Sequence, residues 1–437
     1  MPTIAVHTLG CKVNQYDTQA MLELFLAAGY TEVPISAPAD VYLVNTCTVT
    51  GTGDRKSLQL ARRLRREHPD SRLILCGCMA QHQAGKLLDA GADLVLGTQR
   101  RLEVVSLLRE AEAARQPLCA VSPLQETAGF EPLTISGQSG HTRAVLKIQE
   151  GCDHRCSYCI IPSVRGPVRS RPPEEIRQEA ERLRDAGFRE LVLTGIHLSS
   201  YGKDFSPRLS LTDAIRVLEE TEGILRIRLG SLEPTIATEA FAAELAGMGK
   251  VCPQFHLAMQ SGSDTVLARM KRRYNTRQYR AAATALRRFF PRAALTTDIL
   301  TGFPGETEAE YRETRDFIEE IGFSRIHVFP YSPRPDTPAA AMPDQLPDAL
   351  REQRARELIE LGNRVAERDL AGRIGQETEL LPEEEIRGCW EGYTPEYIRV
   401  RLPKGTVCGC GEPLRVRLTG VVPHGMTGVP LDSPPSA

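Results

Sequence analysis

Three cysteines stand on one short segment of the sequence. Cys152, Cys156 and Cys159 form a C-x3-C-x2-C run. Three thiolates on a tight loop can bind three irons of a cubane and leave the fourth iron open, whereas a structural zinc site is normally closed by four ligands. The spacing therefore favours a 4Fe-4S cluster with one open iron. The alternatives are a zinc loop without its fourth ligand and a ferredoxin-type site with a distant fourth cysteine.

Three further cysteines are far apart in sequence but occupy equivalent positions. Cys11, Cys47 and Cys78 each come directly after, or close behind, a short apolar run, and these runs are TIAVHTL, VYLVNT and RLILCG. Parallel strands joined by right-handed crossovers bring their carboxyl ends to one edge of a sheet. We expect the three thiols to converge there. Cys76 is a possible substitute for Cys78, because strand alternation points both residues to the same face.

The elements around these cysteines indicate an α/β protein. Residues 1-125 alternate strand and helix patterns, with ADLVLG as a fourth strand, which predicts a parallel α/β domain. Residues 138-370 repeat the alternation with six strand candidates, RAVLKIQ, ELVLTGI, ILRIRLG, QFHLAMQ, ALTTDILTGF and SRIHVF. Helix candidates begin near Pro173, Leu211, Thr235, Ser263 and Glu306. Six β/α units predict a partial (β/α)6 barrel with its chemistry at the carboxyl ends of the strands.

The remaining segments connect and extend these two domains. Residues 116–141 bear Pro, Gly, Ser and Thr without a clear period, which predicts a linker or a crossing segment. A helical pattern covers 350–370. Residues 371-435 then contain the short strands TELLPEEE, EYIRVRLP and PLRVRLTGVV, a pattern that suits a small β-barrel of the oligonucleotide-binding kind. A plain stabilising appendage is the alternative.

Composition limits the class of protein. The chain has 437 residues, 41% of them hydrophobic, a net charge of -2 and 12 cysteines, which excludes fibres, wholesale disorder and disulfide-stapled miniproteins. No apolar run is long enough for a membrane span, and the start lacks a secretion signal, so we expect a cytoplasmic protein without a membrane partner. In a reducing compartment, clustered cysteines favour metal or redox chemistry.

Local charge points to a nucleic acid. Between Thr265 and Thr297 there is no acidic residue. The cations of this stretch are Arg269, Lys271, Arg272, Arg273, Arg277, Arg280, Arg287, Arg288 and Arg292. Together with the basic run at 62–66, they are candidates for binding phosphates. A solvated helix face is the alternative.

The cysteine motifs, in their sequence context, resemble those of the radical-SAM methylthiotransferase family. GCDHRCSYCIIPSVRG is similar to the family signature around the cluster that binds S-adenosyl-L-methionine (SAM). TLGCKVNQYDTQ, VNTCTVT and CGCMAQ are similar to the motifs that hold its auxiliary cluster. Further matches, in chain order, are RLGSLEP, HLAMQSGSDTVLARMKRRY, TDILTGFPGET and HVFPYSPRPDTPAA. The C-terminal segment resembles the family's TRAM domain.

The resemblance implies two 4Fe-4S clusters and SAM as both methyl and radical source. Cys152, Cys156 and Cys159 would hold the SAM-cleaving cluster, and Cys11, Cys47 and Cys78 the auxiliary one. Gln260, Asp298 and Gly302, at the ends of barrel strands, are expected near SAM, with burial against structural partners as the alternative. The implied partners are the anticodon stem-loop of a tRNA, a reducing electron donor and a sulfur-supplying system.

The substrate within this family is inferred from fewer residues than the family itself. Lys12-Val13-Asn14 resembles the MtaB group, which acts on C2 of N6-threonylcarbamoyladenosine beside the anticodon, at position 37. The MiaB group, which acts on isopentenyladenosine, and the RimO group, which modifies an aspartate of a ribosomal protein, usually differ here. A non-catalytic iron-sulfur or RNA-binding protein is the alternative from another class. The C-x-C of Cys408 and Cys410, and the isolated Cys119, Cys252 and Cys389, are expected to be ordinary thiols.

Overall fold

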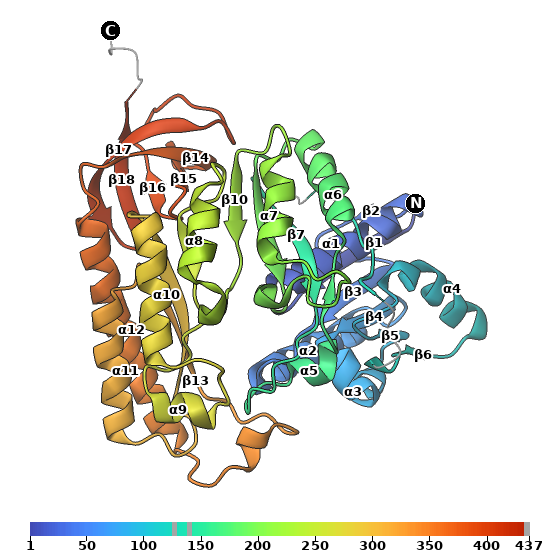
Figure 1. Cartoon of the computed structure of the whole chain (residues 1–437). Helices are drawn as coiled ribbons and strands as arrows, with labels where there is room; N and C mark the ends of the chain where they lie inside the picture. Colours follow the sequence, from blue (N-terminus) through green and yellow to red (C-terminus); the bar gives the residue numbers. More distant parts are fainter. Residues whose placement is uncertain (125–128, 138–141, 432–437) are drawn as a thin grey trace.

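The computed structural model describes residues 1–124, 129–137 and 142–431. Figure 1 shows an α/β part at the N-terminus, a larger α/β part in the middle of the chain, and a small β part near the C-terminus. This arrangement confirms the predicted fold class.

The first part is a parallel sheet in the order β2-β1-β3-β4-β5-β6. Its strands are β1 (Thr3–Thr8), β2 (Thr31–Glu32), β3 (Val41–Thr46), β4 (Arg72–Gly77), β5 (Leu94–Leu96) and β6 (Leu118–Ala120). Its helices are α1 (Lys12–Ala27), α2 (Gly51–Glu67), α3 (Cys78–Asp89), the 3-10 turn η1 (Arg101–Glu103) and α4 (Val104–Ala114). Helices α1 and α4 cover one face and α2 and α3 the other. The central strand β3 is therefore buried along its whole length, as parallel strands covered on both faces are.

The second part is an open barrel of six parallel strands. They are β7 (Arg143–Glu150), β9 (Glu190–Gly195), β10 (Arg226–Leu229), β11 (Gln254–His256), β12 (Ala294–Thr301) and β13 (Arg325–Pro330). A parallel bridge between Leu232 and Leu257 joins the β10 side to the β11 side. The short β8 (Arg169–Ser170) pairs antiparallel with β7. Among the described residues no pairing closes β13 onto β7, so the predicted partial barrel is confirmed.

Helices surround the barrel strands. They are α5 (Ile161–Arg165), α6 (Pro173–Asp185), α7 (Leu211–Glu219), α8 (Glu239–Ala246), α9 (Asp264–Arg269), α10 (Thr276–Phe289), α11 (Glu308–Ile321) and α12 (Asp348–Ala371), with the 3-10 turns η3 (Leu198–Ser200), η4 (Pro234–Ile236) and η5 (Pro338–Ala341). The helix predicted to start at Thr235 starts later, because Thr238 caps α8 by accepting from the Phe241 N–H. Thr307 caps α11 in the same way, with Glu310 completing a capping box.

The third part is a closed β-barrel in the order β14-β15-β16-β18-β17. Its strands are β14 (Glu377–Ile386), β15 (Cys389–Tyr393), β16 (Arg399–Arg401), β17 (Leu414–Val422) and β18 (Gly425–Pro430). The sequence predicted β14, β16 and β17 but not β15 or β18, which are short and rich in glycine. Leu380, Val400, Val416 and Met426 are fully buried inside this small barrel.

The segment 116–141, predicted to be a linker or a crossing segment, also supplies a strand and core residues where the structure describes it. Strand β6 lies in it and pairs in parallel with β5, while Leu133 and Ile135 are buried in the core of the large barrel. The segment therefore contributes to both α/β cores while it crosses between them. The domain limits expected at 125, 138 and 435 lie outside the described residues. Among the described residues, no helix has the length and apolarity to cross a bilayer.

A buried group of charges joins the two barrels. Arg228 donates from Nε to Glu190 at 2.7 Å and from Nη1 to the Pro395 carbonyl at 2.9 Å. Arg226 donates to Glu379 at 2.7 Å. Because Glu190 is fully buried, its carboxylate depends on these arginines for compensation.

We predict that Glu190→Gln destabilises the protein by about 3–5 kcal/mol, because Arg228 is left as an uncompensated buried charge. Urea unfolding of the purified variant measures this loss. The control is Glu239→Gln, which removes the exposed partner of Arg288 and is expected to cost about 0–1 kcal/mol. Equal losses in the two variants would contradict the prediction.

Candidate active site

The first group of thiols, called here the barrel triplet, follows β7. It consists of Cys152, Cys156 and Cys159. The preceding Gly151 has φ +75°, and a Cβ atom there would stand 1.7 Å from the Pro167 carbonyl oxygen. Only glycine permits this close passage of two backbones. The Cys152 N–H then donates to the Gly166 carbonyl at 3.0 Å, so the loop is fixed at the point where it leaves the strand.

The three thiols of the barrel triplet lie in a common buried environment. Burial, with a smaller contribution from the neighbouring Cys156, raises the pKa of Cys152 to about 11 and that of Cys159 to about 12. Arg272 donates from Nη1 to the Cys156 Sγ at 3.0 Å. Its Nη2 donates to Glu233 at 3.0 Å. The guanidinium thus places a fixed positive charge beside a sulfur that would carry negative charge as a ligand.

The second group, called here the amino-terminal triplet, lies at one edge of the first sheet. It consists of Cys11, Cys47 and Cys78. These residues follow the carboxyl ends of β1, β3 and β4, and a Cβ atom on Gly10 would lie 3.1 Å from the Cys47 Sγ. Burial raises the pKa of Cys78 to about 11, with Cys11 and Cys47 adding to the effect. The expected convergence of three sequence-distant thiols is present.

Each triplet offers three thiols, the donor set expected for a 4Fe-4S cluster with one open iron. In neither triplet, among the described residues, do all three sulfurs lie within 4.8 Å of one another. A tetrahedral zinc ion with Zn–S bonds of about 2.3 Å would require sulfurs about 3.8 Å apart.

The structure separates Cys76 from Cys78. Strand β4 ends at Gly77, whose φ of +93° turns the chain, and Cys78 begins α3. The argument that both thiols share a strand face is therefore wrong. The Cys76 thiol donates to the Val44 carbonyl at 3.6 Å and packs in the apolar core on the α1 side of the sheet. Cys78 instead packs with Ile160 and Val164 of the large barrel.

Arg165 connects the two triplets. It ends α5, the helix that begins two residues after Cys159. Its side chain is fully buried and donates from Nε to the Cys78 Sγ at 3.1 Å. Its Nη1 donates to Asp17 at 3.1 Å and to Glu150 at 3.0 Å, and its Nη2 donates to the Asn14 carboxamide oxygen. Arg165 therefore follows the barrel triplet in the chain, while its side chain contacts Cys78 of the amino-terminal triplet.

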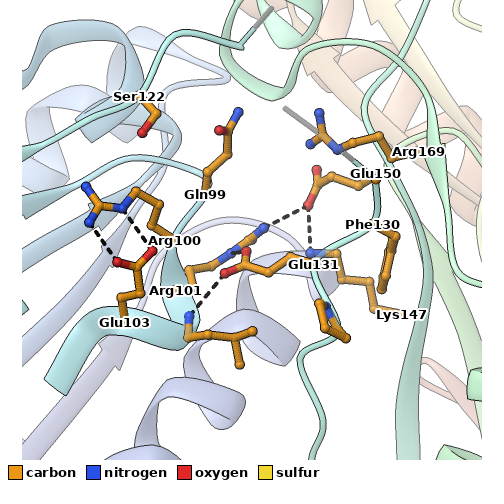
Figure 2. Close-up of a pocket in the computed structure, with 13 residues that line it drawn as sticks. Gln99, Arg100, Arg101, Glu103, Ser122, Phe130, Glu131, Lys147, Glu150 and Arg169 are labelled. Atoms are coloured by element: carbon orange, nitrogen blue, oxygen red, sulfur yellow. Dashed lines mark hydrogen bonds and ion pairs between the residues drawn. The ribbon is translucent and has the colours of Figure 1, made fainter. Parts of the chain in front are cut away.

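The carboxylates that hold Arg165 belong to a larger buried network. Lys147 lies 2.6 Å from both Asp17 and Glu150, and Arg101 pairs with Asp17 and Glu131. Although burial opposes ionisation, these cations hold the pKa of the Asp17 carboxyl below its usual range. Figure 2 shows the part of this network that lines a cavity of about 470 Å³, in which Arg101 points toward Glu131 and Glu150, and Lys147 toward Glu150. The first two parts of the chain are joined by charge as well as by apolar contact.

Comparisons with known proteins agree with this geometry. Residues 146–318 match the Radical SAM superfamily, and residues 3–97 match a family described as Uncharacterized protein family UPF0004. The chain is 41% identical over 429 residues to the threonylcarbamoyladenosine tRNA methylthiotransferase MtaB of Bacillus subtilis (strain 168), covering 96% of this chain and 94% of the relative. The chain belongs to the radical-SAM methylthiotransferase family.

Other relatives carry two different substrate names. The MtaB protein of Thermotoga maritima is 34% identical, with 91% of each chain covered. The tRNA-2-methylthio-N(6)-dimethylallyladenosine synthase of Pelotomaculum thermopropionicum is also 34% identical, over 99% of this chain and 96% of the relative. Among solved structures, the radical SAM methyltransferase TsrM of Kitasatospora setae has a TM-score of 0.58 at 14% identity, covering 78% of this chain and 77% of that one. This last likeness shows the fold alone.

As a radical-SAM enzyme, the methylthiotransferase uses SAM and 4Fe-4S chemistry. The residues present fit these groups, because each triplet offers three thiols and each has an arginine donating to a sulfur. The assignment of each cysteine as a ligand stays a prediction.

Sequence inspection missed three side chains beside the barrel triplet, His154, His197 and Glu233, and gave Arg272 only as a candidate for binding phosphates. The ligand atoms of the two histidines and of Glu233 lie within 4.8 Å of one another, and the two rings are 4.3 Å apart between centroids. Hydrogen bonds from the histidines and the charge of Arg272 keep the pKa of Glu233 below its usual range despite burial. The quoted motifs contain three of these residues: His154 in GCDHRCSYC, Glu233 in RLGSLEP and Arg272 in HLAMQSGSDTVLARMKRRY.

The three residues expected near SAM occupy different settings. Asp298, on β12, lies 3.3 Å from the His256 Nε2. Gln260 has φ +65°, and its N–H donates to the Asp298 carbonyl at 2.9 Å. Gly302 has φ +72°, and a Cβ atom there would stand 2.4 Å from Cγ of Arg351, so close packing against α12 explains this glycine. Contact with SAM stays a prediction for all three.

The basic stretch from 269 to 292 is mostly paired within the protein. Arg269 pairs with Glu310, Arg280 with Glu320 and Arg288 with Glu239, while Arg287 donates to two carbonyls at the end of α11. These paired arginines are less available to phosphates, and phosphate binding by the rest of the stretch stays a prediction. Lys271, Arg273 and Arg277 are exposed, and their side chains have no hydrogen bond or ion pair with the described residues. In the run at 62–66, Arg65 pairs with Asp93.

We predict that Arg165→Met destabilises the methylthiotransferase by about 3–5 kcal/mol, because it leaves Asp17 and Glu150 short of a buried cation. Arg165→Lys keeps the charge and is expected to lose less. Urea unfolding measures both variants, with Arg312→Met, which removes an exposed ion pair with Glu308, as a control expected to cost about 0–1 kcal/mol. A loss in Arg165→Met no larger than in the control would argue against the network.

Proposed function

We propose that the chain installs a methylthio group on C2 of N6-threonylcarbamoyladenosine beside the anticodon of a tRNA. The observation that carries the proposal is the junction of the two triplets through Arg165, in a chain that is 41% identical over almost its full length to an MtaB enzyme. The proposal assigns the auxiliary cluster to the amino-terminal triplet and the SAM-cleaving cluster to the barrel triplet.

The reaction explains why two clusters are needed. Adenine C2–H is an unactivated aromatic position, so acid-base groups alone cannot exchange it for sulfur. When bound, the two clusters would supply the electron that cleaves SAM and the sulfur that is installed, with a first SAM giving the methyl group. The proposal therefore also requires a reducing electron donor and a sulfur-supplying system.

The chain's own residues support this division of labour by charge. Arg272 donates to the Cys156 sulfur and Arg165 to the Cys78 sulfur. Hydrogen bonds to ligand sulfurs stabilise the more negative state of a cluster and so favour its reduction. Arg334, from the loop after β13, pairs with Asp54 and donates to Thr48, the residue after Cys47. Arg165 follows the first barrel strand, β7, and Arg334 follows the last, β13. Side chains from both edges of the open barrel thus contact the amino-terminal triplet or the residue next to it.

Contacts with tRNA are proposed on two surfaces. Lys271 and Arg273 flank Arg272, which contacts the barrel triplet, so their exposed cations are available to phosphates near the site. The C-terminal β-barrel, proposed as a TRAM-like domain over 371-435, is the second surface. The other proposed domains are the methylthiotransferase domain over 1-125 and the radical-SAM barrel over 138-370.

Isopentenyladenosine in tRNA is the second candidate substrate. The observation in its favour is the 34% identity, over 99% of this chain, to a relative named as a dimethylallyladenosine synthase. The identity of 41% to an MtaB protein favours threonylcarbamoyladenosine. A ribosomal-protein aspartate is less favoured, because the relatives described above bear tRNA names.

Cysteine substitutions separate the two proposed clusters. In protein reconstituted without oxygen, Cys156→Ala is expected to abolish release of 5′-deoxyadenosine from SAM, whereas Cys47→Ala should keep that cleavage but form no methylthio product. Each variant should lose about four irons per chain. Cys76→Ala is the matched control and should keep both activities. Loss of SAM cleavage in Cys47→Ala with full cleavage in Cys156→Ala would reverse the assignment.

The substrate is tested in the cell. Deletion of the gene is expected to remove the methylthio form of threonylcarbamoyladenosine from tRNA and to leave the methylthio form of isopentenyladenosine unchanged, as measured by nucleoside mass spectrometry. Re-expression of the wild-type chain should restore the modification, and Cys156→Ala should not. Loss of the isopentenyl product instead would overturn the substrate assignment.

A further inference from the structure

A cavity of about 430 Å³ lies where all three parts of the chain meet. We call it the junction cavity. The first part contributes β1 and one side of α1, the large barrel contributes β7 and β9, and the small barrel contributes the ring of Tyr397. Cys11 of the amino-terminal triplet directly precedes Lys12, which lines the cavity. The junction cavity therefore begins next to the proposed sulfur-carrying site.

Lys12 brings a cation without a partner to this cavity. Its side chain is exposed and forms no hydrogen bond or ion pair with any described residue. Arg143, at the start of β7, lines the same cavity. Two cations thus border one small volume, which favours an anionic occupant.

The acidic side chains nearby are already engaged or distant. Glu383 pairs with Arg143 at 2.8 Å and Glu190 with Arg228 at 2.7 Å. Glu32 also lines the cavity, but it pairs in register with Ile4, four residues before Thr8 on β1. At about 3.3 Å per residue, that places it roughly 13 Å from the end of β1 that leads to Lys12. The Lys12 end of the cavity has positive charge that no described carboxylate neutralises.

A second polar group stands beside Lys12. Gln15 is three residues further along α1, so both side chains lie on the same side of the helix, and both line the cavity. The Gln15 carboxamide has no hydrogen-bond partner among the described residues. An ammonium and a free carboxamide together can bind a carboxylate with an adjoining amide or urea group.

We propose that the Lys12 end of the junction cavity binds the carboxylate of the threonylcarbamoyl group, with Gln15 next to its urea linkage. This inference rests on the proposed function and names a determinant of its specificity. In adenine, C2 and C6 flank the same ring nitrogen, so a base whose C2 faces the amino-terminal triplet carries its N6 substituent on the neighbouring side. An isopentenyl group offers no anion and would leave the Lys12 ammonium desolvated and unpaired.

The test compares three anticodon stem-loops on the reconstituted holoenzyme. They carry threonylcarbamoyladenosine, its neutral carboxamide analogue, or isopentenyladenosine. Dissociation constants and initial rates of methylthiolation are measured for each. The wild-type enzyme is expected to bind the carboxylate form roughly 10- to 100-fold more tightly than the carboxamide form, the range of a charge-assisted hydrogen bond.

Variants then assign this preference to Lys12. Lys12→Gln is expected to bind the carboxylate and carboxamide forms equally, while Lys12→Arg keeps part of the preference. Lys56→Gln, an exposed lysine on α2, is the matched control and should behave as wild type. Because the readout is a ratio of two ligands on one enzyme, a variant with reduced cluster content still reports it.

Two results would overturn the inference while leaving the proposed function intact. One is a wild-type enzyme that methylthiolates threonylcarbamoyladenosine but binds the carboxamide equally well. The other is a full carboxylate preference in Lys12→Gln. A wild-type enzyme that modifies only the isopentenyl stem-loop would instead refute the proposed function, and the inference with it.

Discussion

The arrangement of this enzyme depends on one buried guanidinium. Arg165 lies between two domains that each bring a set of thiols, and it contacts a sulfur on one side and two carboxylates on the other. A buried arginine of this kind is stable only when its charge is compensated, and Asp17 and Glu150 meet that need. Because Lys147 and Arg101 share the same carboxylates, the network resists sliding of one domain over the other. The relative position of the two sulfur sets follows from this electrostatic constraint.

The two triplets are brought together by different backbone arrangements, a sheet edge in one case and a single loop in the other. The amino-terminal triplet uses the edge of a parallel sheet, where successive strands end side by side although their cysteines are far apart in sequence. The barrel triplet uses one loop, in which Gly151 allows the chain to turn closely past Pro167. A sheet edge and a strand-end loop can face each other only if both sheets present their carboxyl ends, and the contact of Cys78 with Ile160 and Val164 shows that they do.

The parallel strands and the barrel triplet could be predicted from the sequence, because each depends on a pattern of neighbouring residues. Apolar runs such as VYLVNT reveal parallel strands buried on both faces, and a C-x3-C-x2-C run needs no tertiary information. Short strands such as β2, with two exposed residues, carry no such pattern. The role of Arg165 was hidden because its partner Asp17 lies 148 residues away. The pairing within the basic stretch was hidden for a related reason, since composition does not tell whether an arginine meets a phosphate or a glutamate on the next helix.

The five residues of α5 have a consequence for how this sequence can vary. They end with Arg165, the arginine that reaches the other domain, and only Ile160 separates them from Cys159. In an α-helix each residue turns the chain by about 100° and advances it by about 1.5 Å. A single insertion or deletion here would turn the guanidinium away from Cys78. Length variation should therefore be tolerated in many surface loops of this protein but not between Ile161 and Arg165.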